Sequence, residues 1–282
     1  MHESGPDHAF AGVPIERVRD FWNTRPCNIN HSARPVGTRE YFDEVERRKY
    51  FVEPHIPGFA EFARWKDRRV LEIGCGIGTD TVSFARAGAR VTAVELSEES
   101  AALARRRVEV YGLTDRVTLH VGNAEDLPAI VPVQPFDLVY AFGVIHHSPR
   151  PLQIVNSLRA YMTAASELRM MVYARASYRV FAIMKEARCW DMSRIDELVA
   201  HHSEAQTGCP VTYTYTHDSI RELLRDFDLR DVRKSHIFTW DVDAYRRYEY
   251  KKAVEWEGVS DTQLAALEKE LGWHLLVTAT LA

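Results

Sequence analysis

The sequence predicts an α/β protein with a parallel sheet, and two observations carry this prediction. From residue 69 on, short apolar runs alternate with amphipathic helical segments, a pattern that requires right-handed crossovers between parallel strands. The first of these runs also enters a turn with glycines at positions 74, 76 and 78, directly before a helical segment. Glycine lacks a Cβ, so the backbone can turn sharply there and approach a ligand closely. We therefore expect a ligand cradle at the end of the first strand.

Two helices are expected before the sheet. Pro14 opens a short helix whose apolar residues recur at helical spacing up to Trp22. Thr38 is the expected N-cap of a second helix, which carries several aromatic residues. Residues 53–58 contain two prolines and are expected to form a rigid connector to the core.

The strands and helices of the core follow in order. We expect the first five strands at residues 70–74, 91–95, 117–121, 136–141 and 168–173. Ser97 is the expected N-cap of the helix after the second strand, and Gly112 is expected to end it.

The last hundred residues depart from strict alternation. A helical insertion rich in arginine and aromatic residues is expected over residues 174–210, and Thr216 caps the helix that follows it. We then expect a strand over residues 232–238, a helix that Gly272 ends, and a last strand over residues 273–281.

The composition is that of an ordinary globular protein. The 282 residues are 46% hydrophobic and 27% charged with a net charge of −4, so nothing indicates nucleic-acid binding. No apolar stretch reaches bilayer length and no export signal opens the chain, so we expect no membrane contact and a cytoplasmic location. The four cysteines stand far apart, which favours a reducing compartment and argues against a zinc site. No other metal-ligand spacing occurs, so no metal is expected.

Three residues narrow the ligand of the cradle. A dinucleotide fingerprint has its third glycine where this chain has Thr79, and the lysine of a phosphate loop is absent. Glu95 ends the second strand about 20 residues after the first glycine, where a carboxylate can bind ribose hydroxyls. Glu72 places a negative charge beside the turn, which would repel a pyrophosphate. A cationic nucleoside without phosphates fits these residues better.

These residues resemble the class I S-adenosylmethionine (SAM) methyltransferases, whose signature is an acidic residue followed by Gly-x-Gly-x-Gly. Segments 122–128 and 136–147 are similar to the adenine-binding segment and the fourth strand of that family, in the same order. Asn123 stands where the family usually has Asp, but its amide oxygen can still accept a hydrogen bond from the adenine amine. The resemblance implies a Rossmann-like seven-stranded sheet with an antiparallel final strand, and SAM as the cofactor.

The resemblance also implies a role for each matching residue. Glu95 is expected to hold the ribose diol and Leu96 to pack on the adenine, while Asn123 and the Ala124 N–H read its edge. The residues expected to bind the cofactor are Glu72, Gly74, Gly76, Gly78, Thr79, Asp80, Glu95, Leu96, Asn123, Ala124, Glu125 and Ala141. Within this set, Gly74 and the Ala141 carbonyl are expected near the methionine portion, and Asp80 near its ammonium group.

Candidate catalytic residues follow the fourth and fifth strands. Tyr173 or Tyr178 can stabilise a sulfonium by cation–π attraction, worth about 0.5–2 kcal/mol, and wall packing is the alternative. His146 is a candidate general base, although the pair with His147 can simply open the next helix. Adjacent side chains should diverge, so at most one of these two rings is expected to point inward. The Ala141 carbonyl is the last candidate of this set.

The N-terminal helices carry many aromatic residues, among them Trp22, Tyr41 and Tyr50. We predict that residues 1–60 form a mobile lid that closes over SAM and excludes water, while residues 61–282 form the SAM-binding core. A static capping face is the alternative. Arg175, after the fifth strand, is expected to face the same substrate side, and the protein is expected to be a monomer or a homodimer.

Three functions stay open at this point. The first is methyl transfer from SAM to a small-molecule acceptor. The second arises because segments 21–28, 41–46 and 53–56 resemble a bacterial branch associated with azetidine-2-carboxylate synthases. That resemblance implies cyclisation of SAM itself, with release of methylthioadenosine and no acceptor. The third is a SAM-binding protein without catalytic activity.

Overall fold

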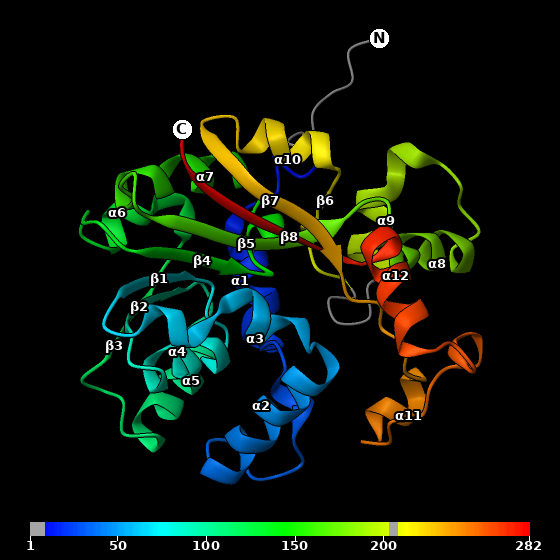
Figure 1. Cartoon of the computed structure of the whole chain (residues 1–282), viewed down its shortest axis with the longest axis horizontal. Coiled ribbons are helices and arrows are strands. Elements are labelled where there is room, and N and C mark those ends of the chain that lie inside the picture. Colours follow the sequence, from blue (N-terminus) through cyan, green and yellow to red (C-terminus); the bar gives the residue numbers. More distant parts are fainter. Residues whose placement is uncertain (1–8, 203–207) are drawn as a thin grey trace.

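The computed structural model describes residues 9–202 and 208–282, and its centre is one twisted sheet (Figure 1). The strand order is β3-β2-β1-β4-β5-β8-β7, with β6 paired to β5. The strands are β1 (Arg69–Ile73), β2 (Arg90–Glu95), β3 (Val117–Val121), β4 (Leu138–Phe142), β5 (Glu167–Ala174), β6 (Thr214–Tyr215), β7 (Phe227–Ser235) and β8 (His274–Leu281). The order reverses between β1 and β4, and ligands bind such sheets outside the carboxyl ends of the strands at this reversal.

The expected sheet is confirmed. β1 is parallel to β2 and to β4, and β5 is parallel to β4. β8 lies antiparallel between β5 and β7, the orientation expected for the final strand. All seven expected strands are present, and the two-residue strand β6 adds a short parallel pairing at the end of β5.

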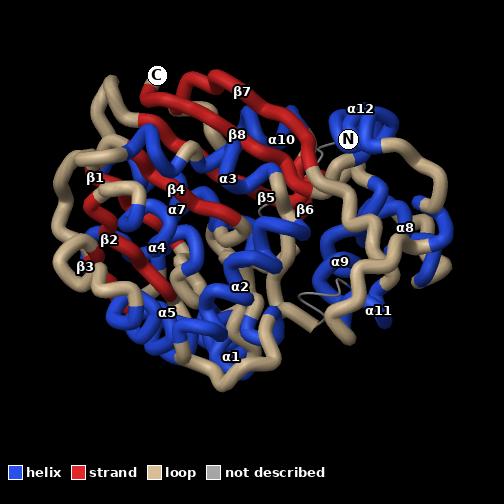
Figure 2. Tube along the Cα trace, turned by 60° about the horizontal axis from the view of Figure 1, so that its bottom comes forward, coloured by secondary structure: helices blue, strands red, loops and turns tan. Residues whose placement is uncertain are grey.

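Helices cover both faces of the sheet (Figure 2). The described α-helices are α1 (Ile15–Thr24), α2 (Arg39–Val52), α3 (His55–Ala60), α4 (Thr79–Arg86), α5 (Glu98–Val110), α6 (Leu127–Ile130), α7 (Pro151–Leu158), α8 (Tyr178–Glu186), α9 (Ile195–His202), α10 (His217–Leu223), α11 (Val242–Arg246) and α12 (Asp261–Leu271). No helix within the described ranges has the length and apolar composition that a bilayer crossing requires.

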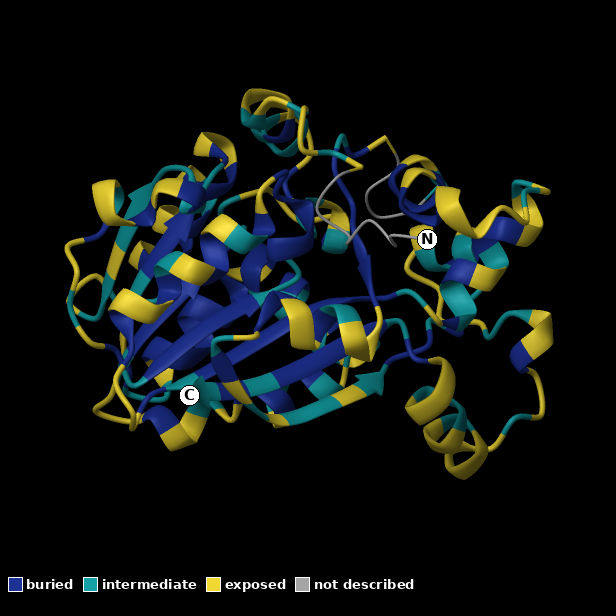
Figure 3. Cartoon of the chain, turned by 90° about the horizontal axis from the view of Figure 1, so that it is seen from above, coloured by how far each residue is buried: buried dark blue, intermediate teal, exposed yellow. Residues whose placement is uncertain are grey.

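Two apolar cores sandwich the sheet, because successive residues of each strand point to opposite faces. Leu71 joins α1, α7 and α10 in one core, and its neighbour Val70 joins α3, α4 and α5 in the other. The inner strands β1, β2, β4, β5 and β8 are accordingly buried along most of their length, whereas the edge strands β3 and β7 are not (Figure 3). This burial fixes the carboxyl ends of β1, β2, β4 and β5, where the site residues lie.

Side-chain caps set the helix starts that the sequence predicts. Thr38 accepts a hydrogen bond from the Tyr41 N–H at 3.2 Å, and Ser97 accepts one from the Ser100 N–H at 3.1 Å. Thr216 forms a capping box with Ser219. These three predicted N-caps are confirmed, and Gly112 follows α5 with a φ of +66°.

The strand expected over residues 232–238 has wrong bounds. β7 begins at Phe227 and ends at Ser235, and the register shifts between Leu229 and Asp231. It is an edge strand with charged, half-exposed residues, so its first half lacks the apolar alternation that marks a strand. The strand ends where His236 adopts a left-handed backbone with a φ of +68°.

The rigid connector expected over residues 53–58 is also wrong, because His55–Ala60 forms helix α3. Pro57 lies in the first turn of this helix, where the missing N–H has no intrahelical partner to lose. Helix α3 therefore carries His55 over the end of the sheet, with its ring centroid 6.1 Å from that of Phe142.

Candidate functional site

The glycine turn after β1 forms a backbone cradle. Gly74, Gly76 and Gly78 all have positive φ angles, of +70°, +55° and +75°. A Cβ built on Gly74 would lie 2.3 Å from Val144 Cγ2, whereas one on Gly76 would meet open space. Gly74 is therefore needed for packing beneath the turn, and Gly76 borders the space left for a ligand.

Glu95 closes the cradle from the end of β2. Its Oε2 accepts a hydrogen bond from the Gly76 N–H at 2.7 Å, and its Oε1 accepts one from the Ser97 N–H at 2.9 Å. Burial raises the pKa of this carboxyl, and the backbone N–H groups oppose that rise. Two fixed N–H donors orient the carboxylate, and its other lone pairs can accept from a diol.

Glu72 lies beneath the cradle and is 3% exposed. Thr81 donates a hydrogen bond to Glu72 Oε2 at 2.6 Å. Burial, reinforced by the charge of Asp80, raises the pKa of Glu72 to about 8. The folded protein therefore holds a proton on Glu72 at pH values where an exposed glutamate would have lost it.

A Glu72→Gln variant is expected to gain stability relative to the wild type as pH rises. The folded-state pKa of about 8 lies above the usual 4.5, so the wild type loses stability between these two pH values. Glutamine does not titrate, and we expect it to be more stable by roughly 2 kcal/mol at pH 8.5 and by much less at pH 5. Urea unfolding of the ligand-free proteins at both pH values measures this difference. A stability difference independent of pH would contradict the assignment.

Asp80 is held in a buried polar network behind the cradle. Its carboxylate accepts hydrogen bonds from Lys49 Nζ at 2.7 Å, from the Tyr50 hydroxyl at 3.0 Å and from the Tyr140 hydroxyl at 3.1 Å. Lys49 and Tyr50 come from α2, so this helix is tied to α4 at the cradle. Thr79 is engaged as well, because its Oγ1 accepts from Arg107 at 2.6 Å.

The residues after β3 form a short 3-10 turn. Asn123 Oδ1 accepts a hydrogen bond from the Glu125 N–H at 3.0 Å, which makes Asn123 the cap of this turn. Glu125 is buried and forms an ion pair with Arg150 at 2.6 Å, so its charge stabilises the loop after β4. Ala124 belongs to the same turn, and Leu96 packs against the apolar core beside it.

An aromatic wall stands at the carboxyl ends of β4 and β5. The ring of Tyr173 lies between Trp273 and His146, with both centroid distances 4.0 Å. His146 is fully buried, and neither ring nitrogen has a hydrogen-bond partner among the described residues. Burial lowers the pKa of His146 well below its usual value, so the ring is neutral. Ala141 lies within β4, directly before Phe142.

The expectation that the two histidine rings diverge is wrong. The rings of His146 and His147 pack against each other with centroids 4.1 Å apart, and both residues are buried. The Nδ1–H of His147 donates to the Val211 carbonyl at 2.9 Å, and Trp22 packs edge-on against the His147 ring. Trp22 is therefore linked to the aromatic wall through His147.

Two other residues expected at the site have their polar groups engaged elsewhere. Tyr41 is fully buried against Ile77, and its hydroxyl donates to the Ile29 carbonyl. Arg175 forms an ion pair with Asp196 at 2.9 Å, which fastens the insertion to the end of β5. Tyr41 therefore supports the glycine turn from behind through the apolar cluster that contains Ile77, and Arg175 is engaged with the insertion, away from the turn.

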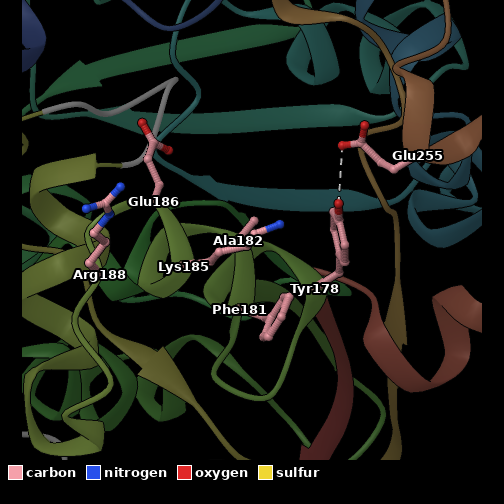
Figure 4. Close-up of a pocket in the computed structure, with 7 residues that line it drawn as sticks. All are labelled: Tyr178, Phe181, Ala182, Lys185, Glu186, Arg188 and Glu255. Carbon is pink, nitrogen blue, oxygen red and sulfur yellow. Dashed lines mark hydrogen bonds between the residues drawn. The ribbon is translucent and has the colours of Figure 1, made fainter.

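Tyr178 lines a different cavity, a surface pocket of about 410 Å³ on the insertion (Figure 4). Its hydroxyl donates to Glu255, and its ring packs edge-on against Trp256. The residues of the glycine cradle do not line this pocket. Ser177 explains the placement, because it caps α8 and thereby starts a helix that carries Tyr178 outward.

One group of polar residues at the sheet edge escapes sequence reasoning. Glu53, His236 and His274 lie close together beside the aromatic wall, although they are far apart in the sequence. Only the register of the last strand, which pairs His274 with Tyr173, could have indicated that these residues meet. That register cannot be read from the sequence.

Comparison with known protein families supports the resemblance to methyltransferases. Residues 70–164 match a family described as a methyltransferase domain. This match covers about a third of the chain. It contains β1 to β4, and with them the glycine cradle and Glu95.

Curated relatives match part of the chain. A ubiquinone biosynthesis O-methyltransferase of Actinobacillus pleuropneumoniae serotype 7 is 31% identical over 98 residues, which are 34% of this chain and 41% of that protein. The enzyme of the same name from Aromatoleum aromaticum is 36% identical over 138 residues, which are 45% of this chain and 57% of that protein. The chain thus spans about half the length of the curated relatives it matches.

Solved structures confirm the class I methyltransferase fold over nearly the whole chain. The geranyl diphosphate C-methyltransferase of Streptomyces coelicolor superposes with a TM-score of 0.60 and 14% identity, covering 99% of this chain and 100% of that one. The magnesium protoporphyrin IX methyltransferase of Synechocystis gives a TM-score of 0.59 and 14% identity, covering 95% and 100%. At this identity the likeness concerns the fold alone.

Proposed function

We propose that this protein transfers the methyl group of SAM to a small-molecule acceptor. The observation that carries the proposal is the pairing of the glycine cradle with Glu95, whose carboxylate is fixed by the Gly76 and Ser97 N–H groups. An oriented carboxylate beside the cradle suits a ribose diol, whereas Glu72 is protonated in the folded protein at neutral pH and does not supply the expected repulsion of a phosphate. The matched methyltransferase domain covers these same residues.

Alignment and the exclusion of water supply most of the rate of an in-line methyl transfer. SAM, when bound, supplies the electrophilic methyl group. Tyr173 is held rigidly between Trp273 and His146, so its ring can form a fixed wall beside the sulfonium. His146 is neutral through burial, so it does not repel a cation, and the same lowered pKa makes it a weak general base.

Cyclisation of SAM is the competing reaction at the same site. It needs a dry aromatic pocket and no acceptor, and the wall of buried Tyr173 with half-buried Trp273 and Phe142 is compatible with that requirement. The matched methyltransferase domain and the O-methyltransferase relatives favour methyl transfer over cyclisation.

The products of SAM turnover distinguish the two reactions. Purified protein is incubated with methyl-labelled SAM, first alone and then with phenols, catechols, carboxylates and amines as acceptors. We expect S-adenosylhomocysteine and a labelled acceptor, formed only when an acceptor is present. Methylthioadenosine and a cyclic imino acid without an acceptor would replace this proposal by cyclisation. Tight SAM binding without any product would leave a binding protein.

Residues 1–60 are proposed to act as the lid of this site, over a core of residues 61–282. Asn23 of α1 accepts a hydrogen bond from the Ser97 hydroxyl beside Glu95, and Lys49 of α2 is paired with Asp80. The N-terminal helices are thus tied to both sides of the cradle. Hydrogen exchange of the α1 and α2 amides is expected to slow at least fivefold when SAM is added. Equal exchange with and without SAM would contradict closure.

A further inference from the structure

A cluster of three histidines and one glutamate lies beside the aromatic wall. Its members come from four elements: Glu53 follows α2, His55 begins α3, His236 follows β7 and His274 begins β8. One oxygen of Glu53 and one nitrogen each of His236 and His274 lie within 4.8 Å of one another. His236 is 7% exposed and His274 is 4% exposed. Such a set of convergent donors in a buried place resembles a metal-binding cluster.

His274 is oriented as a metal-binding imidazole would be. Its Nδ1 shares a hydrogen bond with His55 Nε2 at 2.9 Å, and its Nε2 lies 3.6 Å from Glu53 Oε1. In metal sites, the second ring nitrogen of a ligating histidine is held in this way by a neighbouring group, which fixes the ring and its tautomer. His55 thus acts as the positioning residue, and Nε2 of His274 is turned toward Glu53.

His236 is placed by an unusual backbone. Its φ of +68° lies in the left-handed region, which non-glycine residues seldom adopt. Strain of this kind persists where the surroundings enforce it, and it gathers at functional sites. Within the described part of the chain, the His236 imidazole makes no side-chain hydrogen bond, although its ring centroid is 4.8 Å from that of His274. A buried imidazole without a partner is available to a ligand.

The charge around the cluster is mixed, because Lys49 and Arg233 are positive neighbours of its histidines. Lys49 is the nearby positive residue of α2, and Asp80 pairs with it at 2.7 Å. The Glu53 carboxylate therefore faces the imidazoles without a second carboxylate among its donors. Two imidazoles with one carboxylate are a donor set that zinc uses at sites with an open fourth position. Imidazole ligands disfavour Mg²⁺ and Ca²⁺, which prefer oxygen.

We propose that Glu53, His236 and His274 bind one divalent transition-metal ion of the zinc type, with His55 as the positioning residue. The donor atoms lie up to 4.8 Å apart, and tetrahedral zinc needs roughly 3.4 Å, so side-chain rotations must draw them together. The cluster adjoins Phe142 and Tyr173, with ring centroids of His274 at 5.7 Å and 6.2 Å from theirs. The bound ion would thus lie next to the aromatic wall. The proposal concerns metal binding and does not depend on methyl transfer.

Metal titration of the untagged, chelator-treated full chain tests the site. With Zn²⁺ we expect one equivalent to bind with micromolar or tighter affinity, and with Co²⁺ a visible absorption of tetrahedral type. Mg²⁺ is expected not to compete. His236→Gln and His274→Gln are each expected to weaken Zn²⁺ binding at least about 100-fold while circular dichroism stays native.

Two further variants separate the possible outcomes. The pair of exposed His201 and half-exposed His202 is the matched control, and changing both to Ala is expected to leave the affinity unchanged. Binding that follows this pair instead of His236 and His274 would overturn the proposal, as would the absence of a stoichiometric metal. For the positioning residue, His55→Phe is expected to lower affinity about 10- to 100-fold, and His55→Asn, which keeps a hydrogen-bonding group, to restore much of it. If His55→Phe and His55→Asn bound Zn²⁺ with the same affinity, the hydrogen bond from residue 55 would not be what positions His274.

Discussion

A Glu95→Gln variant is expected to bind SAM about 100-fold more weakly than the wild type. The carboxylate is fixed by the Gly76 and Ser97 N–H groups at 2.7 Å and 2.9 Å, and its remaining lone pairs can accept from the ribose hydroxyls. Hydrogen bonds to a charged acceptor contribute about 1.5–3 kcal/mol each, and the neutral amide loses most of this for the ribose hydroxyls. Isothermal titration calorimetry with SAM measures the change directly.

Glu46→Gln is the matched control for this variant. Glu46 is a partly buried glutamate of α2 that forms ion pairs with Arg86 and Arg107, and it reaches the residues after the glycine turn only through the hydrogen bond from Arg107 to Thr79. Its removal is expected to lower stability slightly and to change SAM affinity less than threefold. If Glu95→Gln and Glu46→Gln weakened SAM binding equally, Glu95 would have no direct role in recognition.

Gly74→Ala and Gly76→Ala are expected to affect different properties. Gly74→Ala should mainly lower stability, and Gly76→Ala should mainly lower the affinity for SAM. At Gly74 the new Cβ would lie 2.3 Å from Val144 Cγ2, so the ligand-free protein should lose roughly 3 kcal/mol of stability, or about 8 °C in Tm. At Gly76 the new Cβ meets open space, so stability should fall by only about 1 kcal/mol, from backbone strain. SAM binding to Gly76→Ala should nevertheless fall at least tenfold, because that space is reserved for the ligand.

A second substitution identifies the cause of the Gly74→Ala defect. Val144→Ala removes the colliding methyl groups, so the double variant is expected to regain about half of the lost stability. The strain of a φ of +70° remains and accounts for the rest. Equal stability losses in Gly74→Ala and Gly76→Ala, or no recovery in the double variant, would contradict the packing argument.

The cradle was predictable because its determinants are local. The run from Val70 to Gly78 holds a strand, a turn and a helix start in contiguous residues, and the Glu95 prediction needs only the length of one crossover. The caps Thr38, Ser97 and Thr216 are equally local and are confirmed. Patterns of this kind report on backbone geometry within about 20 residues.

The cluster of Glu53 and the three histidines was not predictable because strand order creates it. β8 inserts between β5 and β7, and its register places His274 opposite both Tyr173 and Ser235. His236 follows Ser235 directly, and the unexpected helix α3 brings His55 to the same edge. Short spacings between ligand residues cannot reveal this cluster, because its members lie up to 221 positions apart.

Tyr178 and Arg175 are residues that the sequence wrongly placed at the site. Both follow β5 in the sequence, so both were expected at its carboxyl end. Ser177 starts α8 immediately, and Arg175 turns toward Asp196 of the insertion, so neither side chain reaches the cradle. A residue that directly follows a strand can be predicted to lie at that edge of the sheet. The direction of its side chain cannot be predicted in this way.

Calorimetric titration of the wild-type protein with SAM tests the central claim most directly. The account predicts a 1:1 complex with a dissociation constant in the micromolar range, and competition by S-adenosylhomocysteine for the same site. Folded protein that releases no heat with either compound, under conditions in which its circular dichroism is native, would contradict the claim that the turn after β1 and Glu95 hold this nucleoside.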